Sequence, residues 1–336
     1  MGLSQLTAGD PGARADALRR VPGVLWLADT AVKILIPLGG RAADQWYEQI
    51  MTAKTGPPGL HYFPASETNL FAGHPFWWWL PAGIQLCIGA WLLGRPGSRR
   101  ALAVPATWAL VVWVAGEGMG GLPSGVSSLL TGYPGAALLY AVAAAVSLPA
   151  REPRQKAAAA AEMGVLGIYW SRVTWLALWM GAALFSALPQ TGEGGLVFML
   201  SANQAEAPGA LRSLDSSELR WLTVRNTTVP GITLAVACLA VGFAVFLGTL
   251  PRLFLTVSVL IAVATRVTPE NLGGILTGPT ADVGTGPVLI LLALAFWPAG
   301  GPASRWLARQ QPAHGVSARP EPGREAQPAA GHDPAG

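Results

Sequence analysis

Gly-Glu-Gly-Met-Gly-Gly-Leu-Pro-Ser-Gly at 116–125 and Pro-Glu-Asn-Leu-Gly-Gly-Ile-Leu-Thr-Gly at 269–278 are two versions of one segment, 153 residues apart. Both versions keep a glutamate and, three residues later, a pair of glycines. The same offset places Leu25-Trp26 on Leu178-Trp179. A repeat that covers half of a 336-residue chain indicates two similar structural units arranged in tandem.

The composition is that of a membrane protein. Hydrophobic residues make up 51% of the chain and charged residues only 12%, whereas charged residues form about a quarter of a soluble domain. The sequence pI is near 9.4, but the basic residues lie in short segments between apolar stretches and form no patch with interleaved aromatics. This distribution argues against a nucleic-acid partner and makes the lipid bilayer the expected partner.

Eight apolar stretches are long enough, with their flanks, to be membrane spans. They lie at about 22–38, 76–94, 101–116, 133–149, 166–188, 229–249, 252–268 and 286–300. Backbone polar groups must be paired within lipid, so these stretches are expected to be helices. The first stretch contains Asp29 and Lys33 and has no clear cleavage site after it, so we do not expect a cleavable signal peptide.

Lysines and arginines are distributed unequally between the two sides of such a chain. Fourteen fall on the side that holds both termini, and six fall on the other side, mostly in longer loops. The positive-inside rule then places both termini in the cytoplasm of a multi-pass protein of a bacterial-type cytoplasmic (plasma) membrane. The segments at 116–125 and 269–278 are expected to face outward.

The predicted fold is therefore all-α, with eight transmembrane helices as two parallel four-helix repeats. Residues 1–21 form a cytoplasmic N-terminal segment, 22–149 the first repeat, 150–165 a cytoplasmic linker and 166–300 the second repeat. Residues 301–336 are rich in Pro, Ala and Gly and read as a disordered cytoplasmic tail.

Two aromatic-containing segments are expected to lie at the membrane interface. Trp77-Trp78-Trp79 reads as an interfacial anchor, with a stacking platform for a flat ligand as the alternative. Residues 205–225 are a candidate for a short interfacial helix.

Glu117 and Glu270 are the first candidate functional residues, as catalytic groups. Each ends an outward-running span, and a carboxylate at the border of a membrane is costly unless it is paired or hydrated. Arg266 lies four residues before Glu270 on the same helix face, and Trp113 occupies its position in the first repeat. Two readings stay open: the glutamates cap the turn that follows them, or they bind a proton or ligand.

The glycines at 116, 118 and 121 match the spacing G-x-G-x-x-G, but the context excludes a dinucleotide site. That fingerprint must follow a strand and open a helix, whereas here it follows a membrane helix. Tight turns and close helix approach explain these glycines better.

Asp29 and Lys33 are candidates for ligand binding because they share one face of the first span. Their counterparts in the second repeat are Ala182 and Ser186, so the repeat does not need the charges in order to fold. A buried salt bridge or a Lys side chain that extends to the interface is the structural alternative.

Cysteines and histidines add little. Cys87 and Cys238 are expected to be small apolar residues, and a redox pair would need their Cα atoms within roughly 7 Å. No apolar stretch contains a histidine, which excludes haem ligation by transmembrane histidines. The sequence shows no metal-binding motif and no evident cofactor motif.

The chain resembles the DoxX/DoxD-like membrane proteins, a family built on a four-helix unit. The resemblance lies in Leu25-Trp26 through Lys33 and in the stretch from Gly274 to Gly286-Pro287, which includes Asp282. It is weaker over Gly120 through Tyr140, where no aspartate matches Asp282. The resemblance covers about 20–150 and 166–300 as a tandem pair of units.

The resemblance implies an association with membrane redox chemistry, such as a quinone-linked oxidoreductase with membrane redox partner proteins. In that hypothesis Glu117 or Glu270 moves a proton, Arg266 tunes it, and Trp113 and Asp282 join the candidate binding residues. Two alternatives are a transporter or binding protein for a small molecule or lipid, with Asp29 and Lys33 lining a path, and a non-catalytic membrane scaffold.

Overall fold

The computed structural model describes residues 11–35, 76–115, 117, 119, 133–150, 159–188, 209–225, 228–267 and 283–298, and the structural statements below refer to these residues. They are almost entirely helical and contain no strand, only the isolated bridges Pro149–Gly164 and Ala159–Pro298. The all-α prediction is thus confirmed. The elements are α2 (Pro11–Leu35), α5 (Phe76–Gly94), α6 (Arg99–Ala115), α7 (Ala136–Ser147), the 3-10 helix η4 (Ala160–Met163), α8 (Gly167–Ala187), α10 (Gly209–Arg225), α11 (Thr228–Leu247), α12 (Pro251–Val267) and α13 (Thr285–Phe296).

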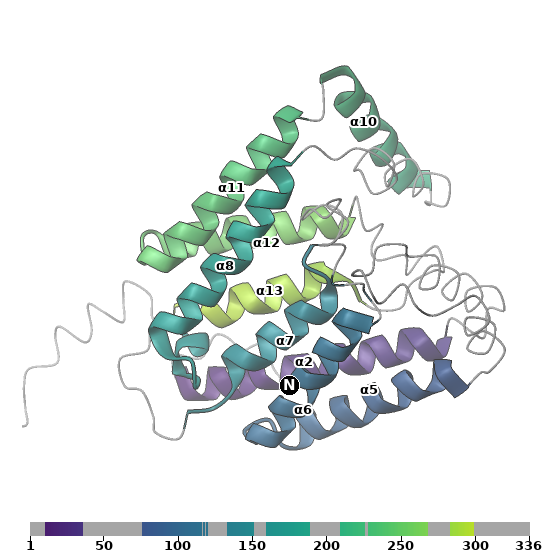
Figure 1. Ribbon diagram of the computed structural model, residues 1–336, viewed down its shortest axis with the longest axis vertical. Helices are drawn as coiled ribbons and strands as arrows, with labels where there is room; N and C mark the ends of the chain where they lie inside the picture. Colours follow the sequence, from purple (N-terminus) through teal and green to yellow (C-terminus); the bar gives the residue numbers. More distant parts are fainter. Residues whose placement is uncertain are drawn as a thin grey trace, which may run out of the picture. The chain divides into compact units, whose positions relative to one another are not determined.

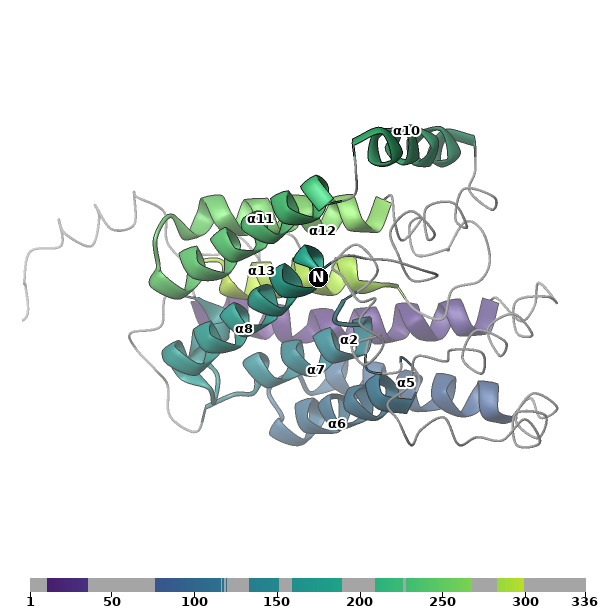
Figure 2. The same cartoon turned by 45° about the horizontal axis from the view of Figure 1, so that its top comes forward.

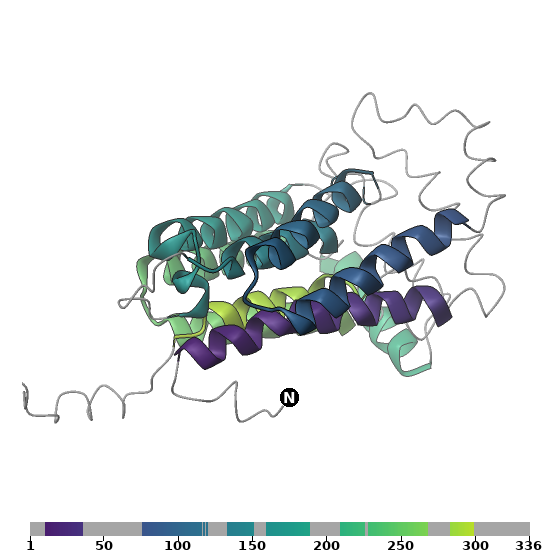
Figure 3. The same cartoon turned by 90° about the horizontal axis from the view of Figure 1, so that it is seen from below.

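The order of helix pairs is the same in both halves of the chain. In the first half α2 packs along α5, and α6 packs along α7; in the second half α8 packs along α11, and α12 along α13. Figures 1 and 3 show α8 beside α11 and α2 beside α5. α7 and α13, the fourth helices of the two halves, also contact each other, and α2 contacts both of them.

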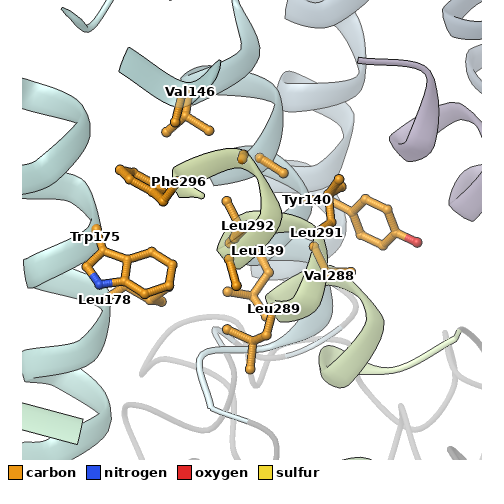
Figure 4. Packing of buried hydrophobic residues seen from close by; sticks show 14 of the residues in the cluster. Leu139, Tyr140, Val146, Trp175, Leu178, Val288, Leu289, Leu291, Leu292 and Phe296 are labelled. Atoms are coloured by element: carbon orange, nitrogen blue, oxygen red, sulfur yellow. The ribbon is translucent and has the colours of Figure 1, made fainter. Parts of the chain in front are cut away.

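The core between the two halves is built from the fourth helices. Figure 4 shows Leu139 and Tyr140 of α7 near Val288 and Leu291 of α13, and Phe296 of α13 near Trp175 of α8. Within the second half, the ring centroids of Trp175 and Phe296 are 4.9 Å apart. These residues are buried, so the contact between the halves is apolar and closely packed.

Equivalent glycines let the first two helices of each half approach closely. A Cβ atom at Gly89 of α5 would lie 2.7 Å from Cγ of Leu27 in α2. Gly242 of α11, 153 residues later, is similarly placed, and a Cβ atom there would lie 3.1 Å from Cβ of Trp179 in α8. Small residues at helix crossings permit this close backbone contact.

Two sets of helices differ in extent from the apolar stretches of the sequence. The first helix begins at Pro11, well before the apolar stretch at about 22–38. The fourth stretches, predicted at 133–149 and 286–300, contain helices of only 12 residues each. A glycine with positive φ precedes each of these helices, Gly135 at 94° and Gly284 at 76°, and this turn sets where the helix starts.

By length and composition, one described helix segment, Val229–Leu247, is long and apolar enough to cross a membrane. Trp79–Gly94, Ala136–Ser147 and Thr285–Phe296 are shorter apolar helices. The segment predicted at 205–225 is a helix, α10, from Gly209 to Arg225. Figure 2 gives a second view of these helices.

Candidate functional site

Trp113 and Glu117, at the end of α6, fasten the beginning of α7. Trp113 Nε1 donates a hydrogen bond of 2.7 Å to the carbonyl oxygen of Pro134. Glu117 Oε1 accepts one of 2.9 Å from the backbone N–H of Ala137, the second residue of α7. A carboxylate there satisfies an otherwise unpaired amide and interacts favourably with the helix dipole. The structure therefore supports the capping role for Glu117, although it caps a helix 20 residues further on and not the adjacent turn.

Gly135 makes this cap possible. Its φ of 94° is unfavourable for a side chain, and a Cβ atom would collide with Glu117 Oε2.

Asp29 of the first repeat holds the beginning of α13 in the second repeat. Asp29 Oδ1 accepts a hydrogen bond of 2.7 Å from the backbone N–H of Val283, and the residue is 1% exposed. Arg266 flanks the same helix end from α12, because a Cβ atom at Gly286 would lie 2.8 Å from Cβ of Arg266. Two candidate residues from different repeats thus each lie beside the same helix terminus. The two others from this region, Glu270 and Asp282, lie outside the described residues.

α2 connects the ends of the two fourth helices. The Trp26 ring packs on Tyr140 of α7 at a centroid distance of 4.5 Å, and Asp29 comes three residues later, about 4.5 Å further along α2. Lys33, one more turn along, is 6% exposed. α2 therefore carries an aromatic contact to α7, a carboxylate at α13 and a buried ammonium group within two turns.

Two further polar residues accompany these charges, and the sequence analysis missed both. Thr30 is buried, and its hydroxyl donates to the carbonyl oxygen of Trp26. Gln85 of α5 is 4% exposed, and its Oε1 atom has no hydrogen-bond partner. Only their positions on the buried faces of apolar helices could have signalled them.

The helix register places Gln85 close to Thr30. α2 and α5 run antiparallel, and their crossing brings Gly23 against Leu92 and Leu27 against Gly89. One turn further along this contact, Gln85 is level with Thr30. We call Asp29, Thr30, Lys33 and Gln85 the Asp29 cluster.

The second repeat carries no charged side chain at the equivalent positions. The positions equivalent to the Asp29 cluster are Ala182, Ala183, Ser186 and Cys238. Beside them, the Tyr133 hydroxyl lies against Gly181, and its ring packs on Phe185 at 5.3 Å. The charged side chains are thus confined to one of two otherwise similar places, which favours a role beyond folding.

Arginines tie helix ends together at the opposite end of the bundle. Arg172 Nε forms an ion pair of 2.7 Å with Glu162 of η4, whose side chain is 4% exposed. Arg19 Nε donates to the carbonyl oxygen of Ser147 at the end of α7, and Arg99 Nε donates to that of Pro149. In the sequence these arginines indicate only the orientation of the chain. The repeat offset could have revealed them, since it places Arg19 on Arg172 and Arg99 on Arg252.

The cysteines do not form a pair. Both are free thiols, Cys87 exposed and Cys238 buried. Of the three tryptophans at 77–79, only Trp79 has a described side chain, and it is 44% exposed. Among the residues that the structure describes, no three His, Cys, Asp or Glu side chains are grouped to hold a metal ion.

Comparison with models of protein families, with curated protein sequences and with solved structures finds no match.

Proposed function

We propose that this chain is an integral membrane protein that crosses the bilayer eight times and binds a small lipid-soluble molecule at the Asp29 cluster. The observation that carries the binding role is the burial of Asp29 and Lys33, at 1% and 6% exposure, on one helix within an apolar bundle. Ionisable side chains at such positions in a membrane are costly and usually functional.

The exposed surfaces of the helices support membrane insertion. Exposed large hydrophobic residues occur on six of the eight helices of the two repeats, all but α7 and α13, and they are densest on α11. Val229, Ile232, Val236, Leu239, Phe243 and Leu247 follow one another at helical spacing along α11, with exposures of 37–64%. A stripe of this size is unfavourable in water but suits contact with lipid tails.

The charged end of the bundle supports the orientation. Arg19, Arg99 and Arg172 bind groups at the ends of helices or in η4, all at the end where α7 terminates. By the positive-inside rule this end faces the cytoplasm, in a bacterial-type cytoplasmic membrane.

The short fourth helices set the depth of the Asp29 cluster. α7 and α13 have 12 residues each, about 18 Å, whereas the hydrocarbon core is about 30 Å thick. Their last residues lie at the arginine end, so their first residues lie inside the membrane. Asp29 and Glu117 then lie within the bilayer and not on its outer face. Helix termini at this depth are common binding elements in membrane proteins.

The ligand we propose is a quinone, and the protein is then a DoxX-like subunit of a quinone-linked membrane oxidoreductase. The DoxX/DoxD-like resemblance supports this choice, as does the combination of a hydrogen-bonding cluster with the Trp26 and Tyr140 rings. Electrons for quinone reduction come from a partner protein in this proposal. Because Glu117 is engaged as a helix cap, we assign the role closest to the quinone to Asp29 and Lys33 and not to Glu117.

A transporter or binding protein for another small molecule or lipid is the second candidate. The observation that favours it is the burial of a carboxylate, Asp29, and an ammonium group, Lys33, in the same helix, since such charges also mark transport paths.

The test is purification of the full chain with its native lipids, followed by mass spectrometry of the bound small molecules. We expect wild type to retain quinone, and the double variant Asp29→Ala, Lys33→Ser, which copies the second repeat, to lose it. The matched control Ala187→Ser alters the exposed end of α8 and should retain quinone. A different retained molecule that the double variant loses would establish the second candidate. Equal contents in wild type and double variant would remove the Asp29 cluster from function and leave a scaffold.

A further inference from the structure

Gln85 is the one member of the Asp29 cluster whose buried polar atom lacks a partner. The residue is 4% exposed, and its Oε1 atom is buried without a hydrogen bond. An unsatisfied buried acceptor is costly, so native proteins seldom keep one without a reason. The equivalent position in the second repeat is Cys238, which is buried as well and needs no such partner.

The surroundings of Gln85 indicate a ligand and not a packing defect. Gln85 lies on the face of α5 that contacts α2, one turn beyond the close approach of Gly89 to Leu27. That turn brings it level with Thr30, whose own hydroxyl is already donated to the carbonyl oxygen of Trp26. Gln85 therefore lies on the α2-facing side of α5, level with the polar residues of α2, and the Thr30 hydroxyl there already donates its proton to another acceptor.

We propose that Gln85 Oε1 accepts a hydrogen bond from a ligand hydroxyl, and that the Asp29 cluster therefore prefers a quinol to the corresponding quinone. The inference rests on the quinone-binding role proposed above. A quinone head presents only carbonyl oxygens, which accept hydrogen bonds, whereas the reduced head presents hydroxyl groups, which donate them. A carbonyl acceptor is satisfied by the reduced form alone, so one residue distinguishes the two forms.

Replacing Gln85 should have opposite effects on the stability of the ligand-free protein and on quinol binding. If the Oε1 atom waits for a ligand, replacing Gln85 with an apolar residue of similar shape removes an unsatisfied group from the ligand-free protein. Gln85→Met should then raise the thermal midpoint of the ligand-free protein by about 2 °C, while weakening quinol binding about tenfold.

The experiment measures binding to the full chain in lipid nanodiscs under anaerobic conditions. The probes are ubiquinol-1, ubiquinone-1, the di-O-methyl ether of ubiquinol-1, which lacks hydroxyl donors, and a short-chain diacylglycerol, which supplies a hydroxyl from a lipid. Wild type should bind ubiquinol-1 about tenfold more tightly than its ether, and Gln85→Met should bind both equally. Cys238→Met, which introduces the same residue at the equivalent position, should keep the wild-type preference.

Any other pattern of binding would refute a specific part of the proposal. Ubiquinol-1 and ubiquinone-1 binding with an unchanged preference in Gln85→Met would refute the role of Gln85 and leave quinone binding intact. A preference for ubiquinone-1 in wild type would mean that the amide donates and would refute the preference for quinol. Diacylglycerol binding that depends on Gln85, without ubiquinol-1 binding, would assign the hydroxyl to a lipid. Absence of binding by any of these quinone probes would refute the quinone role itself. Gln85→Cys, which copies the second repeat, replaces Gln85→Met if the latter does not fold.

Discussion

Single side chains at helix termini decide how the fourth helices of this protein are held. Glu117 reaches from the end of α6 to an amide in the first turn of α7, and Asp29 reaches from α2 to the residue before Gly284. The carboxylates are not interchangeable, since Glu117 caps a helix of its own repeat and Asp29 binds the backbone just before a helix of the other. A carboxylate of the first repeat therefore fastens each fourth helix.

Glu117 should behave as a helix cap in a comparison of two substitutions. Glu117→Gln keeps an oxygen acceptor for Ala137 and should lower the free energy of unfolding by about 0.5 kcal/mol, through loss of the charge at the helix dipole. Glu117→Ala leaves the amide of Ala137 unpaired and should cost about 1–2 kcal/mol. Thermal unfolding in detergent measures both. Equal stability of the two variants would contradict the cap.

At the scale of elements, close helix crossings at equivalent glycines hold the first two helices of each repeat together. Gly89→Ala should lower the free energy of unfolding by about 1–3 kcal/mol, because a Cβ atom there meets Leu27 at 2.7 Å and the carbonyl oxygen of Gly23 at 3.0 Å. Gly242→Ala should cost less, since the nearest atom is 3.1 Å away. Gly83→Ala on the same helix meets nothing within 4 Å and serves as the control, with no loss. A loss at Gly83 as large as at Gly89 would show that the crossing is not the cause.

The ion pair between η4 and α8 should contribute more than its exposed counterpart on α2. Glu162→Gln should lower the free energy of unfolding by about 2 kcal/mol, because it leaves the Arg172 guanidinium, 27% exposed, without its carboxylate. Arg19 is the residue equivalent to Arg172, and its partner is Asp16. Asp16 is 59% exposed, so Asp16→Asn should lower the free energy of unfolding by less than about 0.5 kcal/mol. Denaturant titration of the two variants tests the difference, and similar costs would contradict it.

At the scale of the whole molecule, the sequence predicts the helices better than it predicts the contacts among them. Hydropathy and the 153-residue offset indicate the repeated order of helices, because apolar stretches and short repeats are properties of the chain alone. The 12-residue length of α7 and α13 could not be read in this way, since Gly135 and Gly284 lie within or beside stretches that are apolar throughout.

The candidate site was partly predictable for the same reason. Asp29 and Lys33 are conspicuous as charges in an apolar stretch, whereas Gln85 is a single neutral residue in α5, and its importance depends on the register of α5 against α2. The bond from Val283 to Asp29 joins residues 254 positions apart. Such a contact depends on how the two repeats pack, which no local pattern contains.

The central claim is that these helices cross a membrane with the arginine end inside, and cysteine labelling tests it most directly. In a chain that carries Cys87→Ser and Cys238→Ala, single cysteines are placed at Ser98 and Thr249, in the turns before α6 and α12, and at Ser217 in α10. A membrane-impermeant maleimide is then applied to intact cells and to permeabilised cells.

The account predicts that Ser217→Cys is labelled in intact cells, and that Ser98→Cys and Thr249→Cys are labelled only after permeabilisation. Labelling of Ser98→Cys or Thr249→Cys in intact cells would contradict the orientation. Release of the protein from membranes by alkaline carbonate would contradict membrane insertion itself.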